Sequence, residues 1–176
     1  RSGDLPQPGP GCGCGVRLYG GISAGAAAEL LAAREKAGVL LMGPGMGNTS
    51  DTRALVRALV DGAACTVVLD ADGLNAAAAL LAAGEALPRP AGSLVLTPHP
   101  GEMARLTGLP VAEIEANRPG VAAQYARAWG CTIVLKGHRT IVAAPDGRLW
   151  RNATGNAGLA RGGSGDVLAG MTAGLA

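Results

Sequence analysis

The chain has 176 residues, of which 48% are apolar, and this length and composition predict one domain with a substantial core. No run of about 18 or more apolar residues occurs, and no basic segment leads into an apolar core, so the sequence indicates neither a membrane span nor a signal peptide. The net charge is +2 and the charged residues are scattered, which argues against a nucleic-acid partner but allows a small anionic ligand.

The four cysteines do not form a recognisable site. Cys12 and Cys14 are one residue closer together than a CxxC pair, and Cys65 and Cys131 do not supply the second pair that a zinc site would need. We interpret all four as incidental thiols of a protein in the reducing cytoplasm.

The first residues differ in composition from the rest of the chain. The chain begins with Arg1 rather than Met and its last residues still have helical spacing, so we expect a fragment. Residues 1–15 contain five Gly and three Pro, which favours irregular structure, and a helix is expected over residues 24–37. We therefore expect residues 1–38 to be an irregular or atypical segment and residues 39–176 to be the main domain, truncated at both ends.

From residue 39 onward, short apolar runs typical of buried strands alternate with segments of helical spacing. In chain order, the sequence predicts a strand over 39–42, a helix over 48–61, a strand over 66–69, a helix over 74–83 and a strand over 93–97. These are followed by helices over 101–107 and 119–129, a strand over 132–135, a hairpin over 140–144 and 148–151, and a helix from 165 onward. Asn48, Thr49 or Ser50 is expected to cap the first of these helices.

This alternation predicts an α/β fold with a mostly parallel sheet. The strands are continuous apolar runs, as in sheets that are covered on both faces. Ligands of such sheets bind beyond the carboxyl ends of the strands. Four clusters follow strands here, so we expect them to converge at one edge of the sheet: GPGMG, DADGLN, PHPGE and KGHRT.

The first two clusters allow more than one interpretation. GPGMG, residues 43–47, could admit a ligand or a second backbone segment, or could be a tight turn from strand to helix. In DADGLN, Asp70 and Asp72 could bind a metal ion or orient a substrate hydroxyl, and capping of the next helix by Asp72 is an equally good explanation.

His99 and Lys136 are the candidate functional residues of the other two clusters. His99 lies between two prolines that restrict its backbone at a strand end, which favours a functional role, whereas Glu102 fits a structural role in the next helix. Lys136 ends a strand where a lysine could meet phosphate, and Thr140 could add a hydroxyl. The alternative for this segment, above all for Arg139, is a solvated hairpin.

The strongest signal is GNAGLARGGSGDVLAG, residues 155–170. The unpaired N–H groups at a helix start can hold an anion, and glycines let a phosphate approach closely. An acid such as Asp166 beside that anion would normally repel it. Its presence is explained if the carboxylate accepts a proton from a hydroxyl that attacks phosphate. The alternative is that Asp166 only stabilises the helix dipole.

Five motifs occur in one order: GPGMG, DADGLN, TPHPGEMARL, KGHRT and NATGNAGLARGGSGDVLAGMTAGL. Together they resemble the ADP/ATP-dependent NAD(P)H-hydrate dehydratases, which are members of the ribokinase-like superfamily. GGSGD alone indicates only the superfamily, whereas PHPGE combined with GNxGxAxGGxGD is much more specific. The resemblance extends over residues 39–176 and implies a three-layer α/β/α fold with a mostly parallel central sheet.

The resemblance also implies an activity. Members of this family are lyases that restore NAD(P)H from (6S)-NAD(P)H hydrate, and they use ADP or ATP to phosphorylate the hydrate hydroxyl before elimination. Magnesium is expected with the nucleotide phosphates, without a protein ligand that can be named. The family further implies a homo-oligomer, and fusion to or cooperation with an NAD(P)H-hydrate epimerase.

Carried over position by position, the resemblance assigns residues to each part of the site. Asp166 corresponds to the base that acts on the hydrate hydroxyl. The implied anion hole consists of Gly163, Ser164 and Gly165. The implied nucleotide site consists of Lys136, Gly137, His138, Arg139, Thr140, Asn156 and Gly165. The implied substrate site consists of Gly45, Gly47, His99 and Asp166.

Some residues depart from the family pattern. Ser164 stands where Thr is usual and keeps the hydroxyl, and Arg161 stands where a small or polar residue is commoner. Residues 1–38 do not show the strand, glycine loop and helix with which members begin their substrate site. Two alternatives therefore stay open: a small-molecule kinase of the same superfamily, of the hydroxymethylpyrimidine or hydroxyethylthiazole type, and an inactive nucleotide-binding fragment.

Overall fold

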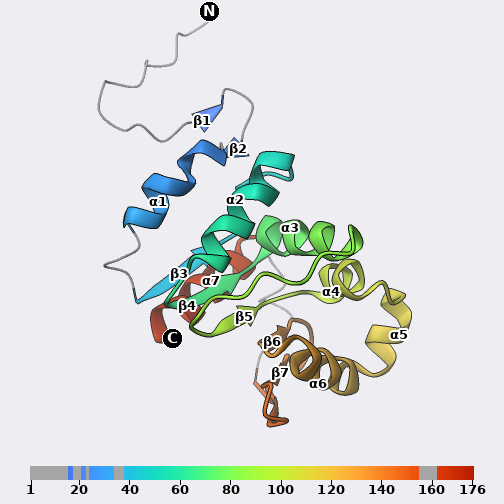
Figure 1. Cartoon of the computed structure of the whole chain (residues 1–176). Helices are drawn as coiled ribbons and strands as arrows, with labels where there is room; N and C mark the ends of the chain where they lie inside the picture. The colour runs from blue at the N-terminus through green and yellow to red at the C-terminus, as the bar shows by residue number, and fades with distance from the viewer. Residues whose placement is uncertain (1–15, 18–20, 23, 34–37, 155–161) are drawn as a thin grey trace, which may run out of the picture.

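The computed structural model describes residues 16–17, 21–22, 24–33, 38–154 and 162–176 (Figure 1). A six-stranded sheet in the order β3-β4-β5-β6-β7-β8 forms its centre. The strands are β3 (Val39–Met42), β4 (Thr66–Leu69), β5 (Leu94–Leu96), β6 (Thr132–Leu135), β7 (Ile141–Ala143) and β8 (Leu149–Arg151). The first four are parallel, and β7 and β8 extend the sheet in antiparallel pairing. The predicted α/β fold with a mostly parallel sheet is confirmed.

Helices lie on both faces of this sheet. The described helices are η1 (Ala24–Ala26), α1 (Ala27–Ala33), α2 (Ser50–Asp61), α3 (Ala71–Ala82), α4 (Pro100–Thr107), α5 (Val111–Ala116), α6 (Arg118–Trp129) and α7 (Ser164–Leu175), and η1 and α1 pack against α2. Because parallel crossovers are right-handed and the parallel strands follow one another in chain order, the connections through α2, α3 and the α4–α6 group run along one face. Helix α7 contacts β3 and β4, and Figure 1 shows it, in red, behind these strands. No described helix combines the length and hydropathy that crossing a bilayer requires.

The core lies between the sheet and the helices that connect its parallel strands. Leu69, Leu96 and Leu135 are fully buried at the carboxyl ends of their strands. Helix α3 is rich in alanine and contacts both α2 and α4, because its small side chains permit close packing. The carboxyl ends of the central strands are therefore held rigidly, and the loops that follow them have fixed starting points.

The elements agree with the sequence predictions most closely where apolar runs are short and continuous. Strands β3, β4 and β6 begin and end at the predicted residues. Thr49 caps α2, since its side-chain oxygen accepts a hydrogen bond from Thr52 N at 3.1 Å. One expected boundary was wrong, since α3 begins three residues earlier than predicted, at Ala71, and the short helix α5 was not predicted.

Described parts of the first 38 residues carry regular structure. β1 (Val16–Arg17) pairs in antiparallel fashion with β2 (Gly21–Ile22), and α1 contacts α2. Residues 34–37 of the helix predicted over 24–37 lie outside the described residues. The domain boundary at residue 39 stays a prediction.

Candidate active site

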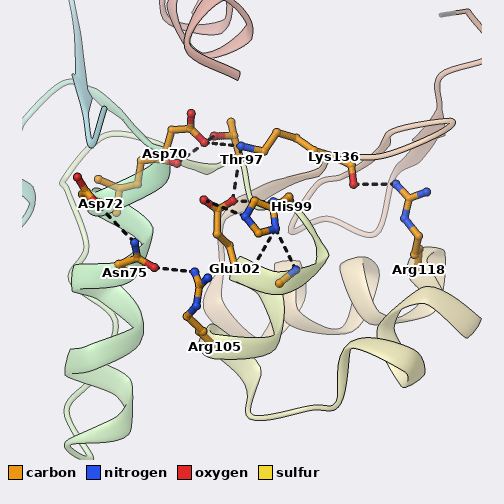
Figure 2. Close-up of polar contacts among 11 residues, drawn as sticks. Asp70, Asp72, Asn75, Thr97, His99, Glu102, Arg105, Arg118 and Lys136 are labelled. Atoms are coloured by element: carbon orange, nitrogen blue, oxygen red, sulfur yellow. Dashed lines mark hydrogen bonds and ion pairs between the residues drawn. The ribbon is translucent and has the colours of Figure 1, made fainter. Parts of the chain in front are cut away.

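Polar side chains from three adjacent parallel strands meet at the edge of the sheet (Figure 2). Asp70 follows β4, Thr97 follows β5 and Lys136 follows β6. The ammonium of Lys136 donates a hydrogen bond to Asp70 Oδ1 at 2.7 Å, and the Thr97 hydroxyl donates to the same oxygen at 2.8 Å. Asp70 is only 2% exposed, so this carboxylate depends on Lys136 and Thr97 in place of water.

A second buried carboxylate approaches the same ammonium from α4. Glu102 Oε2 lies 3.5 Å from Lys136 Nζ and also accepts a hydrogen bond from His99 N at 2.7 Å. Lys136 thus lies between two carboxylates in a group that we call the Lys136 cluster, consisting of Asp70, Thr97, Glu102 and Lys136. The ammonium holds together loops that follow three different strands.

The N-terminus of α7 lies against the Lys136 cluster. A Cβ atom placed on Gly165 would be 3.9 Å from both Asp70 Oδ2 and Lys136 Nζ. Gly163 precedes the helix in a left-handed conformation with φ +86°, which glycine adopts without strain. Asp166 lies in the first turn of α7 and is exposed. The free N–H groups of a helix start, one ammonium and one accessible carboxylate are therefore brought together.

The glycine loop after β3 brings two backbone segments together at one glycine and is open at another. A Cβ on Gly43 would lie 1.6 Å from the carbonyl oxygen of Asp70, so only glycine fits there. A Cβ on Gly45 would have no atom within 4 Å, and Gly47 N donates to Asp72 Oδ2 at 2.8 Å. The second backbone segment that GPGMG could admit is thus that of Asp70 at Gly43, whereas a ligand beside Gly45 stays a prediction.

Capping of α3 by Asp72 was a wrong expectation. Asp70 occupies the N-cap position of α3, and its side chain makes no capping hydrogen bond because its carboxylate is bound in the Lys136 cluster. Asp72 lies inside the first turn of the helix and holds Gly47 instead.

His99 caps α4 with its imidazole. His99 Nδ1 accepts hydrogen bonds from Gly101 N at 3.0 Å and from Glu102 N at 3.3 Å, and the Glu102 carboxylate in turn accepts one from His99 N. Together these bonds form a capping box, which bears out the structural role expected for Glu102. The imidazole is 48% exposed, so it is both a helix cap and a surface open to a ligand. Its role toward a substrate stays a prediction.

The remaining nucleotide-site candidates lie on the loop between β6 and β7. Gly137, His138 and Arg139 are exposed, and the Thr140 hydroxyl donates to Gly137 O at 3.1 Å. Gly137 has φ +143° and Arg139 has φ +58°, so the loop is sharply turned. Asn156, the last candidate, lies outside the described residues, as does Arg161.

Sequence reasoning missed one contact and one residue of the site, the pairing of Asp70 with Lys136 and the position of Arg118. Asp70 was considered only as one acid of a strand-end pair, and its partner Lys136 is 66 residues away. Arg118 gave no signal, because its partners are backbone carbonyls of the loop that contains Lys136.

The cysteines and acids of the described ranges form no metal site. Cys65 and Cys131 are free thiols, and burial raises the pKa of Cys131 to about 12, which keeps that thiol neutral and unreactive. Cys12 and Cys14 lie outside the described residues. Within the described part of the chain, no three His, Cys, Asp or Glu side chains are grouped so as to hold a metal ion. The described residues thus do not form a protein cage for Mg²⁺.

Comparison with known proteins agrees with the geometry of the site. The chain matches the family of NAD(P)H-hydrate dehydratase over residues 18–176, which begins upstream of the predicted limit at residue 39. It is 46% identical to the bifunctional NAD(P)H-hydrate repair enzyme of Moorella thermoacetica, over 89% of this chain and 29% of that protein. It is 41% identical to the ADP-dependent (S)-NAD(P)H-hydrate dehydratase of Bacillus subtilis, over 77% of this chain and 46% of that protein.

Solved structures give the same result. The crystal structure of the ADP/ATP-dependent NAD(P)H-hydrate dehydratase from Bacillus subtilis, co-crystallised with ATP/Mg²⁺, matches with a TM-score of 0.70 and 40% identity over 78% of this chain and 47% of that one. A ribokinase-like superfamily protein from Enterococcus faecalis matches with a TM-score of 0.70 and 31% identity over 87% of this chain and 52% of that one. The chain thus spans about half or less of the length of these relatives. It belongs to the NAD(P)H-hydrate dehydratase family and has the ribokinase-like α/β fold of that family.

Proposed function

We propose that this chain carries the phosphate-donor site of an enzyme that dehydrates NAD(P)H hydrate to NAD(P)H with ADP or ATP. The observation that carries the proposal is the position of the α7 N-terminus, whose Gly165 lies beside Lys136 while Asp166 stays exposed. Relatives named ADP-dependent (S)-NAD(P)H-hydrate dehydratase support the substrate and the nucleotide.

The nucleotide phosphates would lie between the α7 N-terminus and the β6–β7 loop. The backbone N–H groups of Gly163, Ser164 and Gly165 would donate to the phosphate oxygens as an anion hole. Lys136 would add a positive charge nearby, and residues 137–140 together with Asn156 would border the rest of the nucleotide. The nucleotide supplies the phosphoryl group that turns the hydrate hydroxyl into a leaving group.

Asp166 would act as the general base. Its carboxylate would accept the hydroxyl proton of the hydrate while that oxygen bonds to the terminal phosphorus, and the bond from this phosphorus to the nucleotide breaks. The C–O bond of the phosphorylated hydrate would then break, phosphate would leave with the bonding electrons, and loss of a ring proton would restore the double bond. Gly45, Gly47 and His99 would face the hydrate.

The further partners belong to the same proposal. Magnesium would enter with the nucleotide and take its ligands from phosphate and water, since the described side chains offer no cage for it. Cooperation with an NAD(P)H-hydrate epimerase is supported by relatives that are named bifunctional repair enzymes. Assembly into a homo-oligomer is proposed from the family resemblance alone. The names of the relatives do not favour a small-molecule kinase.

Calorimetric titration of the chain with ADP, ATP and AMP in the presence of Mg²⁺ tests the site. We expect ADP or ATP to bind and AMP to bind more weakly, because AMP lacks the phosphate that the anion hole would hold. Gly165→Pro removes one N–H group and should weaken binding of ADP and ATP. Equal affinity for all three nucleotides, or no binding, would contradict the proposal.

A further inference from the structure

We infer that Arg118 is a positioning residue for the proposed nucleotide site: its guanidinium holds the backbone of residues 135–138 so that Lys136 and the turn after it face the nucleotide. What the loop binds rests on the proposed function. The positioning itself is carried by contacts within the chain.

Three carbonyl oxygens share the Arg118 guanidinium. Nη1 donates to His138 O at 2.7 Å, and Nη2 donates to Leu135 O at 2.9 Å and to Lys136 O at 3.1 Å. Figure 2 shows the side chain reaching the loop from α6, on the side away from Asp70. A single side chain thus contacts the last residue of β6, Leu135, and two residues of the loop that follows, Lys136 and His138.

Two other features of Arg118 are unfavourable for a charged side chain at this place. It is the first residue of α6, where the positive end of the helix dipole disfavours a cation. Its Nε atom is buried and has no hydrogen-bond partner among the described residues. The contacts with the three carbonyls therefore account for the placement of this side chain.

The loop in turn has the shape that this contact requires. Gly137 has φ +143°, and a Cβ there would lie 2.8 Å from Arg118 Nη2, so any larger residue would push the guanidinium away. Lys136 N donates to Pro98 O at 2.8 Å, while Lys136 O accepts from Arg118. The backbone of Lys136 is thus held on both sides, and its ammonium is directed toward Asp70.

Lysine could not replace this arginine. A guanidinium presents several donors in a rigid, planar fork, whereas an ammonium is a compact point charge on a flexible stem. The carbonyl oxygens of residues 135, 136 and 138 require several donors in a fixed arrangement. A positive charge alone would not bind all three.

The test compares Arg118→Gln and Arg118→Lys with Arg127→Gln, a control on the last turn of the same helix at an exposed position. Amide hydrogen exchange is measured over residues 137–140, and ADP affinity is measured by calorimetry. For both Arg118 variants we expect faster exchange confined to residues 137–140 and an increase in the ADP dissociation constant of about tenfold or more. Arg127→Gln should match the wild type in both measurements.

Chemical rescue provides a second variant. In Arg118→Ala, methylguanidinium should restore part of the ADP affinity, whereas methylammonium at the same concentration should not. Wild-type exchange over residues 137–140 in Arg118→Gln, or a wild-type result for Arg118→Lys, would overturn the inference. Failure of the wild-type chain to bind ADP would overturn the proposed function instead, and hydrogen exchange would still decide the role of Arg118.

Discussion

Lys136 combines two tasks, because its ammonium both neutralises buried acids and lies beside the α7 N-terminus. Lys136→Met would leave Asp70 with the Thr97 hydroxyl alone, while Asp70 is 2% exposed. Removal of one partner of a buried ion pair costs about 3–5 kcal/mol, and we expect the lower end of this range because the Lys136 side chain is 18% exposed. Urea denaturation measures this loss.

The double variant separates the two tasks. Asp70→Asn in the Lys136→Met background removes the unpaired carboxylate, so part of the unfolding free energy should return, whereas nucleotide affinity should stay low. A single Lys136→Met variant with wild-type stability would contradict the ion-pair geometry, and a double variant with wild-type nucleotide affinity would contradict the role in binding.

His99 can be tested for a role beyond capping α4. Asparagine is also a good N-cap residue, so His99→Asn should keep the free energy of unfolding within about 1 kcal/mol, while His99→Ala should lose about that amount. If His99 faces the hydrate, as we expect, both variants should raise the KM for NAD(P)H hydrate. A wild-type KM in His99→Asn would limit the residue to its helix cap.

Among the elements, the loop after β3 offers a matched pair of glycines. Gly43→Ala would place a Cβ 1.6 Å from Asp70 O, and we expect it to destabilise the fold by about 3 kcal/mol or more. Gly45→Ala meets no atom within 4 Å and has only the strain of φ +73°, about 1–2 kcal/mol. Thermal unfolding of the two variants measures the difference, and equal melting temperatures would contradict this loop geometry.

The elements that sequence predicted well are those whose signals are local. The strands VLLM, TVVL and TIVL are short apolar runs that are followed by glycine or a charged residue, so their carboxyl ends can be read directly. Helix α5 lacks such signals, because it has six residues and Pro110 at its N-cap makes no side-chain capping bond. The start of α3 was misplaced because its first turn, ADG, carries residues typical of loops.

The site was predictable in its location but not in its pairing. Each cluster at a strand end was visible in the sequence, since parallel strands bring such clusters to one edge. That Asp70 pairs with Lys136 depends on the order of the strands in the sheet, which the sequence did not specify. The role of Arg118 could not be predicted from the sequence, because its partners are backbone carbonyls and every residue has one.

At the scale of the whole molecule, the described residues contain the edge of the sheet on which the family's chemistry would take place, within about half the length of the relatives. Strands β4 to β6 and helix α7 together make a continuous frame for Asp70, Lys136 and Asp166. The proposed nucleotide site would draw most of its residues from this frame, and dehydratase activity of this chain is the central claim to be tested.

The most direct test follows the near-ultraviolet absorbance of reduced nicotinamide when the protein is mixed with NADH hydrate, Mg²⁺ and either ADP or ATP. Asp166→Asn serves as the matched control, because it keeps the size of the side chain and removes the basic carboxylate. We expect the NADH absorbance to return with at least one nucleotide and to stay absent in the variant. No return of absorbance with either nucleotide, or an equal return in Asp166→Asn, would contradict the proposed function.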